Sequence, residues 1–160
     1  MKYYICPNKR FLGFLDSLNK EKTAAILCSS YEIDVKKLEK FPNKLVLYFD
    51  DVCEVRNNAF NKDIATKIKL FVSSLSSEIT NMYICCDSGE SRSSAICAAL
   101  MKLQKQDEMT IWKNPYYHPN VLVYKLLCME LGIKISKCNL RYKEYVNRNA
   151  LRKAIKKNRK

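Results

Sequence analysis

Hydrophobic and polar positions divide the chain into short apolar runs and longer stretches with helical spacing. The apolar runs predict buried β-strands at Lys2–Cys6, Thr23–Ser30, Lys44–Phe49 and Met82–Cys85. Apolar residues three and four positions apart predict helices at Lys9–Asn19, Phe60–Leu75, Ser93–Leu103 and Val121–Leu131, and a short helical turn at Asp34–Lys40. Because strands alternate with helices, we expect an α/β fold with three layers, in which helices flank a mostly parallel central sheet of about four strands.

The predicted helices have candidate end signals. Asn8 is a plausible N-terminal cap for the first helix, and Asn57 or Asn58 for the helix that contains Phe60. Gly132 follows the last of these helices and is a typical C-terminal stop.

The stretch Asn81–Leu103, NMYICCDSGESRSSAICAALMKL, joins a strand, a glycine-containing loop and a helix in direct succession. This order predicts a phosphate cradle. The loop N–H groups and the unpaired N–H groups of the first helical turn point into one concavity, where the helix dipole also favours an anion.

Four residues of this stretch have side chains or backbones suited to phosphate chemistry. Cys86 begins the loop, among donors that favour a nucleophilic thiolate. Arg92 ends it with a planar guanidinium that matches two phosphate oxygens. Gly89 is expected to let the backbone turn where a Cβ would crowd the anion, and Ser93 to donate its hydroxyl to the Cys86 sulfur.

The motif CDSGESRSSAICAAL resembles the signature of cysteine-dependent protein tyrosine and dual-specificity phosphatases, most closely the small bacterial and phage branch. The resemblance implies a phosphomonoester hydrolase that forms a phosphocysteine on Cys86 and uses neither metal nor cofactor. It also implies a phosphorylated substrate, with a phosphoprotein as the first expectation. The phosphate would be bound by Arg92 and by the loop residues Asp87, Ser88, Gly89, Glu90 and Ser91.

Two features of the loop depart from that family pattern. Cys85 stands where the family has a histidine, and the carboxylates of Asp87 and Glu90 oppose a dianionic substrate unless they point outward. A phosphate-binding module of the same fold, catalytically weak or inactive, is therefore an alternative function.

A general acid is expected at the carboxyl end of the third strand. Breaking a phosphoester requires a proton for the leaving oxygen. The segment LVLYFDD resembles the family's general-acid loop and favours Asp51, with Asp50 as the alternative. Both residues are also compatible with a simple strand-ending turn.

The resemblance extends from about Lys2 to Gly132. The aromatic-rich segment YYHPN, followed by the helix at Val121–Leu131, is similar to the corresponding segment of the small phage and bacterial branch. His118 within it titrates near neutrality, but its position before a helix-starting proline favours a capping or packing role.

Composition limits the other possibilities. The 160-residue chain has no apolar run long enough to span a membrane and no continuous signal-peptide core, so a cytoplasmic protein is expected. Eight cysteines then indicate free thiols in a reducing compartment. A single histidine and the absence of Cys-x2-Cys spacing make a metal site unexpected.

Positive charge is concentrated at the C-terminal end. Of the net +13, residues 134–160 carry +10, from eleven Lys and Arg and one acid, Glu144. We therefore expect a phosphatase-like catalytic domain at 1–133 and a basic C-terminal helix or tail at 134–160. Such a tail suits an acidic partner or a nucleic acid, and it leaves a phosphatase acting on RNA 5′ phosphates as another alternative.

Overall fold

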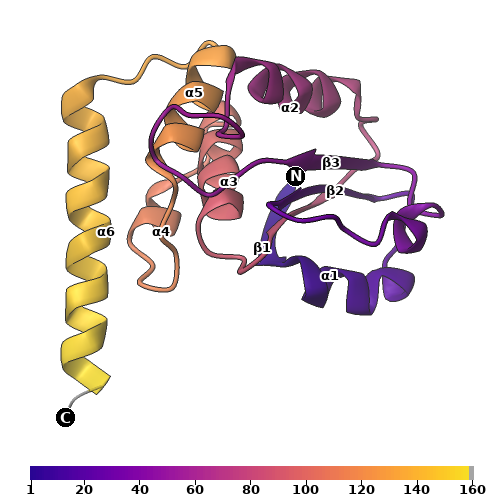
Figure 1. The fold of residues 1–160 in the computed structure, drawn as a ribbon, viewed down its shortest axis with the longest axis horizontal. Coiled ribbons are helices and arrows are strands. Elements are labelled where there is room, and N and C mark those ends of the chain that lie inside the picture. Colours follow the sequence, from indigo (N-terminus) through magenta and orange to yellow (C-terminus); the bar gives the residue numbers. More distant parts are fainter. Residues whose placement is uncertain (159–160) are drawn as a thin grey trace.

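The computed structural model describes residues 1–158 and contains one parallel four-stranded sheet (Figure 1). Its strands are β1 (Lys2–Pro7), β2 (Thr23–Ser29), β3 (Lys44–Tyr48) and β4 (Asn81–Cys86), in the spatial order β1-β4-β2-β3. All three strand pairs are parallel, so the four carboxyl ends lie along the same edge of the sheet.

The burial of the strands follows their place in the sheet. Every residue of the central strand β2 is buried, whereas the edge strand β3 has one buried residue in five. A continuous apolar run such as TAAILCS is typical of a strand covered on both faces.

Helices cover both faces of the sheet and complete three layers (Figure 1). On one face, α1 (Asn8–Phe14) and the 3-10 turns Leu15–Ser17 and Val35–Leu38 surround a core that includes Phe11 and Phe41. On the other face lie α2 (Lys62–Ser74), α3 (Arg92–Leu103) and α5 (Val121–Glu130), which pack on the larger core. The predicted α/β fold with a four-stranded parallel sheet is confirmed.

Two further helices lie C-terminal to α3. The short α4 (Met109–Trp112) was not predicted, because four residues are too few for a periodic pattern. The long α6 (Lys137–Asn158) packs beside α4, and its C-terminal end projects past the body of the molecule (Figure 1). Within residues 1–158, no helix is both long and apolar enough to cross a membrane.

The predicted caps of the first two helices were wrong. Asn8 is the first residue of α1 and makes no cap, because its side chain donates to Cys28 O at 2.8 Å and to Asp87 Oδ1 at 3.2 Å. The cap of α2 is Asn61, whose side chain accepts from the Ile64 N–H at 3.0 Å. The predicted stop at Gly132 lies just past α5, with a φ of +74°.

Candidate active site

All four strands end beside one loop, residues 86–92. The residue after β1 is Asn8, β2 ends at Ser29 and is followed by Ser30, and β3 leads through Phe49 to Asp51. β4 ends at Cys86, which is followed by Asp87. Side chains or backbone atoms from all four ends contact the loop or its arginine, as expected for a site at the carboxyl edge of a parallel sheet.

Cys86 lies at the floor of the loop. The residue is fully buried, and its Sγ is 3.1 Å from Ser93 Oγ, in the first turn of α3. The predicted contact between Cys86 and Ser93 is present. A hydroxyl at this distance can donate to the sulfur and stabilise negative charge on it.

The backbone of the loop presents unpaired donors. Within residues 1–158, none of the N–H groups of residues 88–93 donates to another protein group. The carbonyls of Glu90 and Ser91 are held by the Ser94 hydroxyl, which fixes the turn into α3. A row of free N–H groups at the start of a twelve-residue helix forms a site for an anion.

Arg92 is almost fully buried, with 4% exposure, and its guanidinium is held by protein oxygens. Nη1 donates to Phe49 O at 2.7 Å and to Ser30 Oγ at 3.1 Å. Nη2 donates to Asp87 Oδ2 at 2.6 Å. The Nε–H has no hydrogen-bond partner within the described residues, so it and the second Nη2 hydrogen are the donors left for a ligand.

The Asp87 carboxylate points away from the row of loop N–H groups. Its Oδ1 accepts from Ser29 Oγ at 2.6 Å and from Asn8 Nδ2, and its Oδ2 accepts from the Ser30 N–H and from Arg92. Four donors therefore surround the Asp87 carboxylate, which would repel a dianionic substrate if it pointed toward it. The other loop carboxylate, Glu90, is half-buried and makes no side-chain hydrogen bond or ion pair within residues 1–158.

These contacts determine the charge state of the pair. Partial burial raises the pKa of Asp87, but the hydrogen bonds from Ser29, Arg92 and Ser30 outweigh it, and the pKa lies below its usual value. For Arg92, burial lowers the pKa, but the Asp87 carboxylate raises it more. Both groups are therefore ionised at neutral pH.

Asp51 is attached to the loop, and Asp50 is not. Asp51 Oδ1 accepts from Ser91 Oγ and from Asn120 Nδ2, both at 2.8 Å, and Oδ2 lies 3.9 Å from Arg92 Nε. The Asp50 side chain makes no hydrogen bond or ion pair within the described residues, and its N–H donates to Asn58 O. Of the two candidates for the general acid, Asp51 is the one that lies beside Arg92.

Asn120 is a site residue that the sequence argument missed. Its side chain accepts from the Val123 N–H at 3.1 Å as the N-terminal cap of α5. The same side chain donates to Asp51 Oδ1 and to Val52 O, and its own N–H donates to Ser91 O. In the sequence, Asn120 lies directly before an apolar helix. This position indicates an N-terminal cap but does not indicate the contact with Asp51.

His118 also supports the loop, through its backbone. Its N–H donates to Glu90 O at 3.1 Å, while its side chain is exposed. The segment 118–120 thus contacts two consecutive carbonyls of the loop.

The structure gives a reason for a glycine at position 89 that was not predicted. A Cβ there would lie 2.6 Å from Pro7 N and 2.7 Å from Cys6 C, so it would collide with the end of β1. The φ of +74° at Gly89 independently disfavours a side chain.

Cys85 and Cys86 face opposite sides of the sheet, as predicted from strand geometry. Cys85 lies with Cys6 across the β1–β4 pair, with their sulfurs 3.6 Å apart. Burial raises the pKa of Cys85 well above its ordinary value and that of Cys97 to about 12, so these thiols stay protonated.

Metal-binding clusters are absent from residues 1–158: no group of three or more His, Cys, Asp or Glu side chains is placed to hold an ion. The donors around Cys86 are N–H groups, hydroxyls and a guanidinium, which suit an anion and not a cation.

Comparisons with known proteins give structural similarity only. No family model matches the sequence, and no curated protein does. A crystal structure of PTPMT1 in complex with PI(5)P is similar over 96% of this chain and 94% of that chain, at 13% sequence identity and a TM-score of 0.47. A second crystal structure of PTPMT1 is similar over 97% and 95% of the two chains, at 15% identity and a TM-score of 0.46.

Proposed function

We propose that this chain is a phosphomonoester hydrolase that acts through a phosphocysteine on Cys86. One observation carries the proposal: Cys86 and Ser93 lie 3.1 Å apart at the base of a loop whose N–H groups 88–93 have no acceptor among residues 1–158. An anion-binding loop built around a thiol combines a binding site for phosphate with a nucleophile for phosphorus.

In the first step, the Cys86 thiolate attacks the phosphorus of the ester. A P–S bond forms, the P–O bond to the leaving group breaks, and Asp51 transfers its proton to the departing oxygen. The ester must lie between these two groups, and the contacts of Asp51 with Ser91 and Arg92 support this role for its carboxyl group.

In the second step, water attacks the phosphocysteine. The P–S bond breaks, inorganic phosphate forms, and the sulfur leaves as a thiolate. Ser93 assists here by donating its hydroxyl to the leaving sulfur, and the Asp51 carboxylate accepts a proton from the attacking water.

Arg92 and the loop amides stabilise the charge that develops on the phosphoryl oxygens. The two remaining hydrogens of Arg92, on Nε and Nη2, form a side-on fork for two of these oxygens. Because Nη1 is fixed by Phe49 O and Ser30 Oγ, the guanidinium needs little reorganisation when the substrate binds.

The proposal assigns catalysis to residues 1–133 and a separate role to the basic segment 134–160. A phosphoprotein is the substrate class that we propose first. All eight cysteines are free, which suits a reducing compartment such as the cytoplasm.

Hydrolysis of p-nitrophenyl phosphate by the purified full-length chain tests the proposal. Cys86→Ser should abolish turnover and leave the circular dichroism spectrum unchanged. Asp51→Asn should lower kcat strongly and Asp50→Asn only weakly. Ser93→Ala should slow the second step, so that a burst of nitrophenolate precedes a slow steady state.

Two results would contradict the enzymatic function. Unchanged turnover in Cys86→Ser would exclude the thiol mechanism. Saturable binding of phosphotyrosine to the wild-type chain without turnover at any pH from acid to neutral would instead support a non-catalytic phosphate-binding module.

A further inference from the structure

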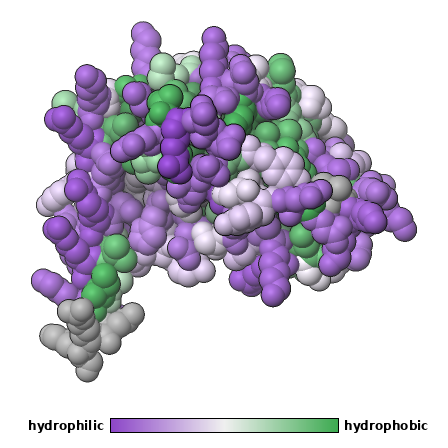
Figure 2. All heavy atoms as spheres, in the orientation of Figure 1, coloured by the Kyte–Doolittle hydropathy of each residue, from purple (hydrophilic) through white to green (hydrophobic). Residues whose placement is uncertain are grey.

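The helix α6 carries unpaired positive charge over most of its length. Seven of its Lys and Arg side chains are exposed: Lys137, Arg141, Arg148, Arg152, Lys153, Lys156 and Lys157. None of the seven forms an ion pair with a carboxylate in residues 1–158. In Figure 2 the upper part of α6, at the left of the view, shows mostly hydrophilic residues.

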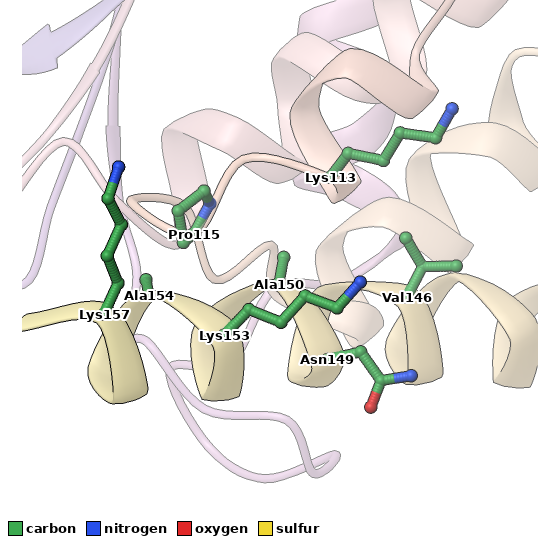
Figure 3. Close-up of a pocket in the computed structure, with 8 residues that line it drawn as sticks. All are labelled: Lys113, Pro115, Val146, Asn149, Ala150, Lys153, Ala154 and Lys157. Carbon is green, nitrogen blue, oxygen red and sulfur yellow. The ribbon is translucent and has the colours of Figure 1, made fainter.

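The helix also forms one wall of a groove (Figure 3). The groove has a volume of about 580 Å³ and lies between α6 and the Lys113–Pro115 segment. Three lysines, Lys113, Lys153 and Lys157, line it from both sides. Between them lie apolar groups of Pro115, Val146, Ala150 and Ala154.

In the close-up, the lysines extend from different parts of the chain. Lys113 comes from the end of α4, whereas Lys153 and Lys157 come from consecutive turns of α6 (Figure 3). The lining residues of α6 run from Val146 to Lys157, about 16 Å along the helix axis at 1.5 Å per residue. The groove therefore offers an elongated apolar floor with cations along its edges.

We propose that this groove binds single-stranded nucleic acid. Each nucleotide of a single strand carries one phosphate charge and one flat, largely apolar base. The groove offers lysines for the phosphates and an apolar floor for the bases. The lysines pair with successive phosphates and displace counterions, while bases make apolar contacts with Pro115, Val146 and Ala150. A duplex keeps its bases stacked inside and cannot use the floor.

An anionic membrane fits these observations less well. A membrane-binding helix presents one continuous apolar face with large side chains. The large exposed apolar side chains of α6 are Tyr142, Tyr145 and Ile155; Tyr142 and Tyr145 are neighbours, but Ile155 lies ten residues further along, almost three turns at 3.6 residues per turn, so the three do not form a continuous face. The apolar residues that do share a face line the groove, where they are small and half-buried.

An acidic peptide shares only the negative charge of a nucleic acid. Its carboxylates suit the three lysines, but acidic side chains provide no flat apolar group for the floor between them. The comparison of RNA with polyglutamate therefore separates the two partners.

The binding site is separate from the Cys86 loop and does not depend on the proposed phosphatase activity. None of the residues that line the groove contributes to the contacts of Cys86, Arg92 or Asp51. An oligonucleotide with a 5′-hydroxyl carries no terminal phosphomonoester, so its binding reports on the groove alone.

The test is fluorescence anisotropy with a short single-stranded RNA that has a 5′-hydroxyl and a 3′ fluorophore. The full-length chain and its Cys86→Ser variant should bind with equal affinity. The triple variant Lys113→Glu, Lys153→Glu, Lys157→Glu should raise Kd by at least about tenfold. It should also reduce the slope of log K against log salt by about 2, since each of three lost phosphate contacts contributes about 0.7.

A matched control has the same change of charge elsewhere. Lys36→Glu, Lys62→Glu, Lys67→Glu replaces three exposed lysines that lie outside α4 and α6 and form no ion pair with the part of the chain that the structure describes. This variant should change Kd less than twofold. Near-ultraviolet circular dichroism of both triple variants should match that of the unmodified chain.

Three outcomes would overturn the proposal. The first is equal loss of RNA binding in the control triple variant. The second is loss only in Arg141→Glu, Arg148→Glu, Arg152→Glu, which changes α6 outside the groove. The third is binding of duplex RNA, polyglutamate or phosphatidylserine vesicles that is as tight as binding of the single strand.

Discussion

Arg92 donates to three protein oxygens in the folded chain, and the only carboxylate among its hydrogen-bond acceptors within residues 1–158 is Asp87. The Asp87 side chain is about one-third exposed, whereas that of Arg92 is 5% exposed. The arginine therefore depends on this partner more than the aspartate does, since an unpaired buried cation is costly.

Asp87→Asn should destabilise the chain by about 1–3 kcal/mol at pH 7, because the buried guanidinium loses its hydrogen-bonded carboxylate and keeps only the more distant Asp51, at 3.9 Å. The pKa of Asp87 is lowered by folding, so its stabilising effect is present above the usual aspartate range and is lost as the pH falls through the lowered value. Urea unfolding at neutral and acid pH measures the effect. The difference between wild type and variant should shrink on acidification, and a difference that is constant with pH would contradict this role.

Gly89→Ala should destabilise the chain by more than about 2 kcal/mol, since left-handed strain adds to a collision with the backbone of β1. Gly132→Ala is the matched control: its φ is also +74°, but a Cβ there meets nothing within 4 Å. The control should lose only about 1–2 kcal/mol and keep the proposed phosphatase activity. Thermal unfolding of the two variants provides the comparison, and equal losses would exclude the collision.

At the scale of elements, the start of α5 joins two loops of the site. Asn120 caps α5 and also holds Asp51 and the Val52 carbonyl. Asn61 caps α2 in the same way but has no contact with the site. Comparing variants of the two asparagines therefore separates the effect of losing a helix cap from the effect of releasing Asp51.

Asn120→Ala and Asn61→Ala should each lose about 1 kcal/mol of stability through the missing cap. Only Asn120→Ala should also lower kcat for p-nitrophenyl phosphate, by about tenfold, because Asp51 loses one of its two hydrogen-bond donors. Chemical denaturation and steady-state kinetics check both points. Equal kcat values for the two variants would show that Asn120 acts only as a helix cap.

The sequence predicted the elements better than the contacts between them. Apolar runs and helical spacing were sufficient for the four strands and for α2, α3 and α5, because burial on one or two faces leaves a local pattern. The Cys86–Ser93 contact was also predictable, since seven positions join a strand end to a helix start.

Contacts between distant positions left no such pattern. Asn8 lies 79 residues from the Asp87 carboxylate to which it donates, and it was mistaken for a cap. The order β1-β4-β2-β3 brings these positions together, and a single sequence does not reveal that order. For the same reason, Gly89 was interpreted through the ligand and not through its neighbour Pro7.

At the scale of the whole molecule, one buried carboxylate connects three helices. Glu108 Oε1 accepts from Lys102 of α3 at 2.9 Å and from Lys143 of α6 at 3.0 Å, and it lies 3.5 Å from the Tyr124 hydroxyl of α5. Asn147 adds a second connection, since it donates to Trp112 O and Tyr117 O just before the segment that supports the loop. The basic helix is therefore fixed to the body by the buried Lys143–Glu108 pair and by Asn147, and not by its exposed cations.

Glu108→Gln should destabilise the chain by about 3–5 kcal/mol at pH 7, because Lys143, whose side chain is 3% exposed, becomes an unpaired buried cation. Burial raises the pKa of Glu108, but the hydrogen bonds from Lys102 and Lys143 lower it more, so the pKa lies below its usual value. The stabilisation is therefore complete above the usual glutamate range and disappears as the pH falls through the lowered pKa. Hydrogen exchange of the α6 amides at neutral and acid pH measures the release of the helix.

Two further variants decide whether the buried charge is the cause. Glu130→Gln removes the pair with the exposed Lys69, at 3.4 Å, and should cost less than about 1 kcal/mol. Glu108→Gln combined with Lys143→Met removes both charges and should recover most of the lost stability, since an apolar side chain of similar length needs no partner. If the double variant is no more stable than Glu108→Gln alone, Glu108 stabilises α6 through its packing, and the slow exchange of the helix should then persist at acid pH in the wild-type chain.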